Sequence, residues 1–281
     1  MIIDGKNIAN QIRLNLKQFV LKNDIQDKIG LAVVLVGQDP ASHIYVNNKV
    51  RACTQIGIRS MVYKLPDNIS QVELVQLVDS LNQDRIIDGI LLQLPLPSHI
   101  DAQKVIDHID SKKDVDGLSK NNVYNLQKGY DCLKPCTPLG IMKLIASTGV
   151  VVEGKHAVVV GRSEIVGKPM VQLLNLSNAT VTNCHSLTSN LAQLTSLADI
   201  LIVAVGQRHL IGVKHVKKGA IVIDVGINRL DNKLYGDVDF EQVKDIASYI
   251  TPVPGGVGPM TIAMLMSNVI KAAGYDIKTM L

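Results

Sequence analysis

The regular alternation of short apolar runs with amphipathic segments constrains this chain more than any other feature. Runs rich in Val, Ile and Leu, of the kind that form strands buried on both faces, occupy residues 31–36, 89–94, 157–161, 199–205 and 220–225. The segments between many of these runs carry apolar residues at helical spacing. Because a strand–helix–strand connection joins parallel strands, the sequence predicts an α/β fold in which helices cover the faces of parallel sheets.

Further helices and strands complete this pattern. Ser70 and Glu73 form a capping box, which predicts that a helix begins there. The expected helices cover residues 8–20, 42–56, 70–82, 101–109, 137–147, 167–176, 191–197, 240–246 and 260–273, and the other expected strands cover 59–65 and 179–183, with a hairpin at 230–238.

The polar segment 111–134 contains few periodic apolar positions and indicates a domain boundary. It is followed by Thr137-Pro138, a helix cap and a first-turn proline, which begin the helix expected to link the two parts. We expect a first domain of residues 1–136, completed by the last helix at 259–281, and a second domain of residues 137–258.

Composition excludes several classes of function. The net charge is only +4, aromatic residues make up 3% and Trp is absent, so nothing resembles a basic nucleic-acid surface. The N-terminus has no signal-peptide pattern, and no apolar run approaches the roughly 18 residues of a membrane span. No pair among Cys53, Cys132, Cys136 and Cys184 has a metal-site or redox spacing. We therefore expect no metal site, no membrane partner, and reduced thiols in a cytoplasmic protein.

The turn between the run at 157–161 and the next expected helix resembles a dinucleotide-binding turn. Glycines let the backbone approach a pyrophosphate, and a helix N-terminus favours its charge. Gly161 opens the turn, but Ser163 stands at the second glycine position of G-x-G-x-x-G and Val166 at the third. A simple tight turn is the alternative. The repeated strand–helix units that follow favour a Rossmann-type domain.

The same region predicts which dinucleotide binds. NAD sites usually have an acidic residue at the end of the second strand, to bind the ribose hydroxyls. Here that strand ends in Asn183-Cys184-His185-Ser186 without a carboxylate. Arg162 and Ser186 could instead bind a 2′-phosphate, so we expect NADP, the alternative being that Arg162 is only a surface charge.

Tyr45 and Lys49 lie four residues apart in an expected helix, so their side chains share one face. An aromatic ring beside an amine can hold a flat heteroaromatic substrate and pass protons to it. An amine does so near neutral pH only if part of its population is neutral. The alternative is an ordinary helix with a solvated lysine and a half-buried tyrosine.

Six stretches together resemble the bifunctional methylenetetrahydrofolate dehydrogenase/methenyltetrahydrofolate cyclohydrolase (FolD) family over essentially the whole chain. They are residues 45–49, 88–97, 113–117, 135–138, 161–169 and 252–261. The resemblance implies a homodimer that binds NADP and tetrahydrofolate derivatives in a cleft between two domains. Its two reactions would oxidise 5,10-methylenetetrahydrofolate to the 5,10-methenyl form and then hydrolyse that form to 10-formyltetrahydrofolate.

The resemblance also implies roles for residues of the first domain, the catalytic domain. Lys49 matches the catalytic lysine that moves protons during water attack and ring opening, and Gln93 matches the glutamine that hydrogen-bonds it. Tyr45 matches the tyrosine that packs on the folate rings. Asp116 matches the carboxylate that anchors the amino edge of the pterin, with an Asx-turn at Asp116-Gly117 as the alternative.

Other positions match the cofactor and substrate contacts of the family. Pro254, Gly255 and Gly256 would line the site near folate and nicotinamide. Leu187 stands where many relatives have a basic residue, which removes one partner for a 2′-phosphate. The expected cofactor contacts are Gly161, Arg162, Ser163, His185, Ser186, Gly226 and Ile227.

Two alternatives to the bifunctional enzyme remain open from the sequence. One is a dehydrogenase without cyclohydrolase activity, against which the presence of Lys49 and Gln93 argues. The other is a protein that binds folate and nucleotide without turnover. Separate assays of the two reactions distinguish them.

Overall fold

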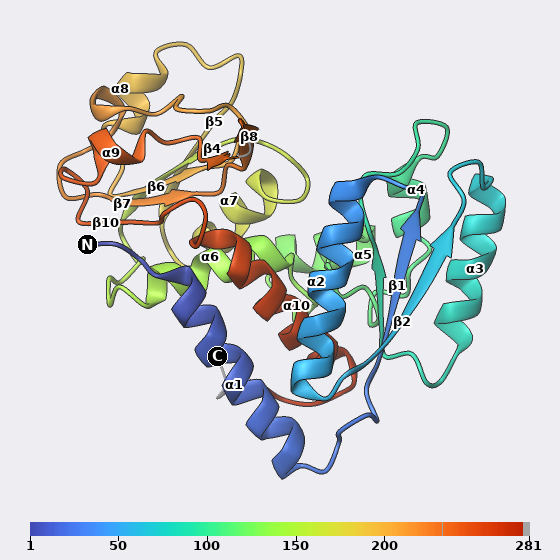
Figure 1. Ribbon diagram of the computed structural model, residues 1–281. Helices are drawn as coiled ribbons and strands as arrows, with labels where there is room; N and C mark the ends of the chain where they lie inside the picture. Colours follow the sequence, from blue (N-terminus) through green and yellow to red (C-terminus); the bar gives the residue numbers. More distant parts are fainter. Residues whose placement is uncertain (232, 278–281) are drawn as a thin grey trace. The chain divides into compact units, whose positions relative to one another are not determined.

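The computed structural model describes residues 1–231 and 233–277, which form two compact units (Figure 1). Unit 1 contains Met1–Ala9 and Thr137–Thr261, and unit 2 contains Asn10–Cys136 and Ile262–Leu281. The helices α1 (Gly5–Lys22) and α10 (Val257–Ala272) each contribute residues to both units.

The first nine residues belong to unit 1, whereas the sequence prediction placed them in the first domain. Ile2 forms a parallel bridge with Ile250, and the backbone N–H of Lys6 donates to the carbonyl of Gly255 at 2.9 Å. These bonds join segments far apart in the sequence, so local patterns did not indicate them.

Unit 2 is built on a parallel sheet of three strands in the order β2–β1–β3. Its strands are β1 (Gly30–Val36), β2 (Arg59–Leu65) and β3 (Gly89–Leu92). All seven residues of β1 are buried, because helices cover both faces of this central strand. Ala32, Val34 and Val36 share one core cluster with residues of α3 (Gln71–Gln83) and α4 (Ala102–Ile106). The helix α2 (Pro40–Ile56) packs against β1 and β2.

The helix α5 (Lys120–Lys128) was not predicted, because the polar segment around it was interpreted as a boundary. Only Asn122 and Leu126 are buried in α5, so its apolar periodicity is too weak to identify it. The buried carboxylate of Asp114 holds its start by accepting from the N–H of Ser119 at 2.7 Å and from the Asn122 amide at 2.9 Å.

Unit 1 contains a parallel sheet of five strands in the order β10–β7–β6–β4–β5. Its strands are β4 (His156–Val160), β5 (Thr180–Cys184), β6 (Ile200–Val203), β7 (Ile221–Asp224) and β10 (Tyr249–Ile250), of which the two-residue β10 was not predicted. The other elements are α6 (Cys136–Ala146), α7 (Gly167–Leu176), α8 (Leu191–Thr195), η1 (Val213–His215), α9 (Phe240–Val243) and the antiparallel strands β8 (Asn228–Leu230) and β9 (Lys233–Tyr235). The predicted hairpin corresponds to β8 and β9, while its turn residue Asn232 lies outside the described residues.

The strand order of unit 1 determines where a ligand can bind. The chain passes from β4 to β5 on one side and then crosses to β6 on the other, so the order reverses between β4 and β6. Ligands of open α/β sheets bind at such a switch point, beyond the carboxyl ends of the strands. Gly161 follows β4 there with φ of 128°, and a Cβ at this position would lie 2.3 Å from the carbonyl oxygen of Ala204. Only glycine allows the two strand ends to approach so closely.

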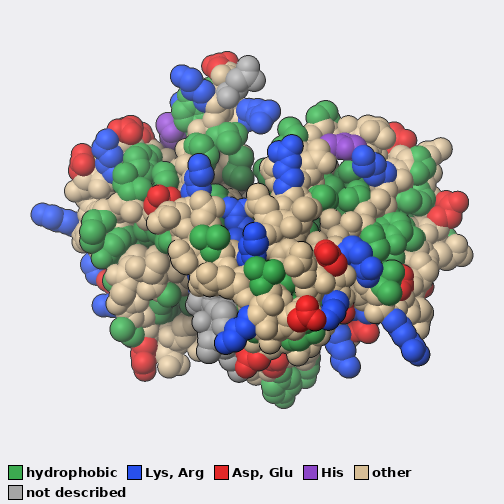
Figure 2. All heavy atoms as spheres, turned by 60° about the horizontal axis from the view of Figure 1, so that its bottom comes forward, with side chains coloured by type: hydrophobic (Ala, Val, Ile, Leu, Met, Phe, Trp, Pro, Cys, Tyr) green, Lys and Arg blue, Asp and Glu red, His purple; other side chains and the backbone are tan. Residues whose placement is uncertain are grey.

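The α/β class and the parallel sheets that the sequence predicted are therefore confirmed. Among the described residues, no helix is long and apolar enough to cross a membrane. Figure 2 shows basic side chains on one face of the molecule with acidic and uncharged groups between them.

Candidate active site and cofactor site

The side chains of Lys49 and Gln93 meet in unit 2. Lys49 lies on α2, whose start is capped by Asp39: its carboxylate accepts from the N–H of Ser42 at 2.8 Å. Gln93 directly follows β3, and its backbone N–H donates to the carbonyl of Val34 at 2.9 Å. The ammonium Nζ of Lys49 donates to Oε1 of Gln93 at 3.0 Å.

The orientation of the Gln93 amide is fixed by its own backbone. Its Nε2 donates to the carbonyl of Leu94 at 2.6 Å, which leaves Oε1 to face Lys49. Gln93 is 9% exposed, so both ends of this nearly buried amide have a partner. The following bond, Leu94–Pro95, is a cis peptide, as is Val253–Pro254 in unit 1. A neutral acceptor stabilises the lysine as a donor without holding it as a permanent cation, which a carboxylate would do.

Tyr45 precedes Lys49 by one turn of α2 and is 45% exposed. Its exposed ring, on the same helix face as the amine, can stack on a flat ligand. Tyr45 and Lys49 therefore share one face of a helix, as the sequence predicted.

Asp116 lies in the electrostatic environment of Lys49. Burial raises the pKa of its carboxyl group, while the charge of Lys49 lowers it, the charge of Asp114 raises it and a hydrogen bond from Cys136 lowers it. The neighbouring turn is closed by the N–H of Gly117 donating to the carbonyl of Asp114 at 3.0 Å. The Asp114 carboxylate bonds Ser119 and Asn122, which follow the turn.

Cys136 and Asn268 support this site and were not assigned a role from the sequence. The Asn268 amide donates at 2.8 Å to the carbonyls of Val115 and Lys134, and the Cys136 thiol donates to the Val115 carbonyl at 3.3 Å. Burial raises the pKa of Cys136 well above its usual value, so the thiol stays protonated beside Asp116. The stretch 135–138 was recognised as a motif, but only the fold brings α10 to it.

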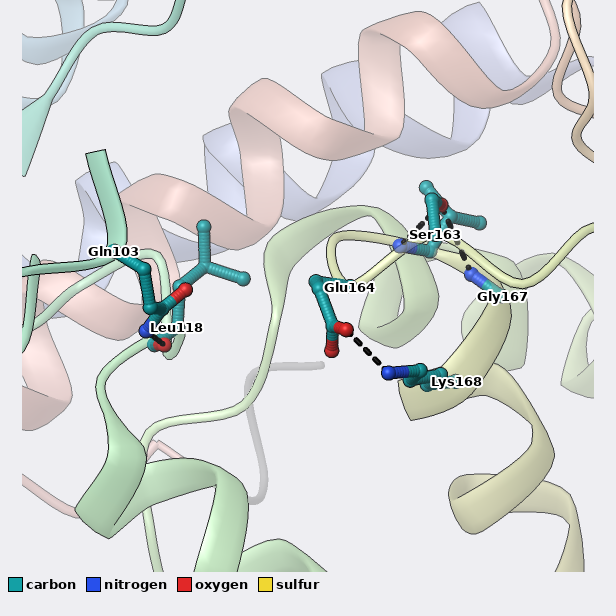
Figure 3. A network of polar contacts seen from close by, with 7 residues as sticks. Gln103, Leu118, Ser163, Glu164, Gly167 and Lys168 are labelled. Carbon is teal, nitrogen blue, oxygen red and sulfur yellow. Dashed lines mark hydrogen bonds and ion pairs between the residues drawn. The ribbon is translucent and has the colours of Figure 1, made fainter. Parts of the chain in front are cut away.

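In unit 1, the predicted dinucleotide-binding turn has a different arrangement of glycines from the standard motif. Ser163 Oγ accepts from the N–H groups of Val166 and Gly167, both at 3.3 Å (Figure 3). A Cβ at Gly167 would lie 2.4 Å from the carbonyl oxygen of Gly161. The glycine that permits close helix–strand packing is thus Gly167 rather than the residue at 166, and Ser163 binds backbone N–H groups at the start of α7. Lys168 also pairs with Glu164 in this turn.

The other expected cofactor contacts follow the carboxyl ends of neighbouring strands. Arg162 follows β4 and Ser186 follows β5, and both residues are exposed. Ile227 follows β7 and is 53% exposed, so its side chain is accessible to an apolar face of a ligand. Gly206, after β6, has open space where a Cβ would be. An α-helix N-terminus, exposed polar and cationic side chains, an apolar platform and open backbone together fit a dinucleotide.

Pro254, Gly255 and Gly256 also lie in unit 1. Gly255 has φ of 107°, and a Cβ at Gly256 would lie 2.6 Å from the carbonyl oxygen of Pro252, so this stretch needs glycine. The helix α10 begins directly afterwards at Val257, earlier than the predicted start at 259–260.

Comparison with known proteins gives the family. The model of the tetrahydrofolate dehydrogenase/cyclohydrolase catalytic domain matches residues 3–116, and that of the NAD(P)-binding domain of the same family matches residues 135–277. The chain belongs to this family. "Bifunctional protein FolD" of Moorella thermoacetica is 56% identical over 97% of this chain and 98% of that protein. The corresponding protein of Halalkalibacterium halodurans is 54% identical over 97% and 98%.

Solved structures of the tetrahydrofolate dehydrogenase/cyclohydrolase family have the same fold. The bifunctional FolD enzyme of Campylobacter jejuni has a TM-score of 0.95 at 49% identity and covers 98% of both chains. The Trypanosoma brucei enzyme, solved with NADP and an inhibitor, has a TM-score of 0.93 at 36% identity and covers 99% of this chain and 98% of its own. As a family member, the chain is a bifunctional methylenetetrahydrofolate dehydrogenase and methenyltetrahydrofolate cyclohydrolase with an NAD(P)-binding domain.

Proposed function

We propose that Lys49, Gln93, Tyr45 and Asp116 of unit 2 carry the folate chemistry, and that unit 1 binds NADP. The observation that carries this assignment is the hydrogen bond of 3.0 Å between Lys49 Nζ and Gln93 Oε1. It places an amine beside a neutral acceptor, within reach of an aromatic face and under the electrostatic influence of a carboxylate. We further propose that unit 2 is the folate-binding domain and that unit 1 is the NADP-binding domain.

In the cyclohydrolase reaction, Lys49 moves protons. Its neutral form accepts a proton from the water that attacks the methenyl carbon, and the resulting ammonium donates that proton to the ring nitrogen as the carbon–nitrogen bond breaks. The hydroxyl group left on the carbon becomes the formyl C=O and releases its proton to solvent. The product is 10-formyltetrahydrofolate. Gln93 orients the amine throughout, since its Oε1 accepts from Lys49 and its Nε2 is held by Leu94.

Asp116 and Tyr45 hold the substrate in both reactions. An ionised Asp116 accepts from the amino edge of the pterin, and the bound ligand's N–H groups stabilise that charge. The Tyr45 ring packs on the flat folate ring system. When bound, NADP accepts the hydride from the methylene carbon in the dehydrogenase reaction.

The cofactor contacts in unit 1 divide by chemistry. The N-terminus of α7 with Gly161 and Ser163 binds the pyrophosphate, and Arg162 with Ser186 binds the 2′-phosphate. Ile227 covers an apolar face of the cofactor. Pro254, Gly255 and Gly256 contact the substrate. The proposed active form is a homodimer in the cytoplasm, without a nucleic-acid or membrane partner. The four free and buried cysteines agree with a reducing compartment such as the cytoplasm.

A single assay tests this assignment. Wild type and Lys49→Met receive methylenetetrahydrofolate and NADP, and NADPH, methenyl- and formyltetrahydrofolate are followed separately. We expect wild type to form NADPH and the formyl product, and Lys49→Met to hydrolyse methenyltetrahydrofolate about 100-fold more slowly or worse. Lys64→Met, on the exposed edge strand β2, is the matched control and should behave as wild type.

Other outcomes would replace the proposal. Formation of NADPH without formyl product would indicate a monofunctional dehydrogenase. Binding of both ligands without product would indicate a binding protein. Hydrolysis at the wild-type rate by Lys49→Met would remove Lys49 from the mechanism.

A further inference from the structure

Two aspartates that the sequence left without a role lie buried at the carboxyl ends of β6 and β7. Asp224 is 3% exposed and Asp237 is 0% exposed. Asp224 is the last residue of β7, and Asp237 follows the hairpin of β8 and β9. Uncompensated burial of two neighbouring carboxylates is unfavourable, so the pair requires an explanation.

Hydrogen bonds from backbone and amide N–H groups compensate for the burial of the two carboxylates. Asp224 accepts from the N–H groups of Gly226 at 3.0 Å, Asp237 at 2.9 Å and Val238 at 2.9 Å. Asp237 accepts from the N–H groups of Val205 at 2.8 Å and Gly206 at 3.0 Å, and from the Asn228 amide at 2.9 Å. The pair therefore satisfies backbone groups of three separate loops.

Two glycines make room for the pair. A Cβ at Gly236 would lie 1.7 Å from Oδ2 of Asp224, and a Cβ at Gly226 would lie 2.3 Å from Oδ1 of Asp237. Burial raises the pKa of Asp224 to about 6, backbone N–H groups of Val238, Asp237 and Gly226 lower it, and the charge of Asp237 raises it. The two glycines thus leave space for the carboxylates, and the surrounding N–H groups stabilise their charge.

One loop that the pair holds contains the expected cofactor contacts Gly226 and Ile227, and another lies at the switch point of the sheet. Val205 and Gly206 follow β6 at the switch point of the sheet, where Gly206 has open space at its Cβ position. Gly226 and Asn228 flank the exposed Ile227. A loop that is already fixed loses less conformational entropy when a ligand binds.

We propose that Asp224 and Asp237 are positioning residues for NADP, which hold the loops after β6 and β7 in the conformation that binds the cofactor. The inference rests on the proposed location of the NADP site in unit 1. Neither carboxylate contacts the reacting atoms. Their effect is expressed in cofactor binding, and the proton transfers of Lys49 in unit 2 do not depend on them.

The test compares Asp237→Ala with Asp199→Ala. Asp199 is the matched control because it precedes the same strand β6, at the opposite end of the sheet, where it accepts from the N–H of His156 at 3.0 Å and pairs with Lys217 at 2.7 Å. For each variant, the KM for NADP and the kcat of the dehydrogenase are measured. The hydrolysis of methenyltetrahydrofolate without NADP and the melting temperature are measured as well.

We expect Asp237→Ala to raise the KM for NADP by about tenfold or more, since two loop N–H groups and the Asn228 amide lose their acceptor. Its cyclohydrolase rate should stay within about twofold of wild type, and so should the KM for NADP of Asp199→Ala. An unchanged KM for NADP in Asp237→Ala would overturn the inference. A proportional loss of both activities would also overturn it, because that result indicates a merely structural role.

Asp224→Asn provides a second test if Asp237→Ala fails to fold. An amide NH2 cannot accept, so at least one of the three N–H groups at Asp224 loses its partner whichever way the amide turns. The KM for NADP should rise by about threefold or more relative to Asp199→Asn. An unchanged KM would overturn the inference. If wild type does not reduce NADP with methylenetetrahydrofolate, the proposed function itself fails, before any variant is compared.

Discussion

Replacement of Gln93 by glutamate tests why a neutral partner faces Lys49. The change places a carboxylate about where Oε1 now accepts from Lys49 Nζ at 3.0 Å. Two unit charges at that distance attract each other by about 5.5 kcal/mol at an effective dielectric constant of about 20. Exposed ion pairs contribute only about 0–1 kcal/mol. Lys49 is partly exposed and Gln93 nearly buried, so a value between these bounds applies, about 2 kcal/mol.

This attraction favours the ammonium over the neutral amine that accepts the proton from water. At about 1.4 kcal/mol for each factor of ten, the neutral fraction falls about thirtyfold. Gln93→Glu should therefore lower the kcat of methenyltetrahydrofolate hydrolysis by about thirtyfold at neutral pH, with a recovery as the pH rises. The assay is the absorbance loss of the methenyl substrate between pH 6.5 and 9.5.

Gln83→Glu is the matched control, because it adds the same charge at the exposed end of α3, before the start of β3. The glutamate also loses the bond from Nε2 to the Leu94 carbonyl, which costs about 1 kcal/mol of stability and is seen in the melting temperature rather than in the pH profile. A wild-type rate in Gln93→Glu, or a reduction that does not depend on pH, would refute the argument.

Three further predictions concern the cofactor, the core and the pH dependence of stability. Arg162→Ala should raise the KM for NADP by about tenfold and leave the KM for NAD unchanged. The control Lys155→Ala, before the start of β4, should change neither KM. Equal effects of Arg162→Ala on the KM for both cofactors would contradict a 2′-phosphate contact. Leu74→Ala, at a fully buried position of α3, should lower the free energy of unfolding by about 2–5 kcal/mol in urea titrations, against at most about 0.5 kcal/mol for Val72→Ala, which is exposed on the same helix. Since the folded pKa of Asp224 is raised from 3.8 to about 6, its contribution to stability is present below about pH 4 and is lost as the pH rises through 6. The free energy of unfolding of wild type relative to Asp224→Asn should therefore fall by about 3 kcal/mol between pH 4 and pH 7, and a difference that does not vary with pH would contradict the raised pKa.

Much of the architecture follows from local sequence. The buried strands β1 and β6 coincide with unbroken apolar runs, because a strand covered on both faces has few polar positions. In β4 and β7 the apolar run is interrupted only at one end, by His156 and Asp224. The capping box of Ser70 and Glu73 is present at the start of α3. The prediction of an α/β chain with parallel sheets needed only such short-range patterns.

The site required more than short-range patterns. Lys49 and Tyr45 could be paired through helical spacing, but only the resemblance suggested that Gln93, 44 residues away, bonds Lys49. The helix α5 was not predicted because polar side chains satisfy much of its buried face, and hydrophobic periodicity does not register such contacts.

The sequence by itself determined the fold class, the two-part organisation and the residue types of the candidate site, because these depend on periodicity and on motifs read along the chain. The tertiary structure alone decided the strand order that creates the switch point, the assignment of residues 1–9 to unit 1, and the pairing of Asp224 with Asp237. Each of these joins backbone groups that are distant in sequence or lie on different loops. Their partners are selected by burial and by the need to satisfy every buried N–H, and neither condition is visible in a local window.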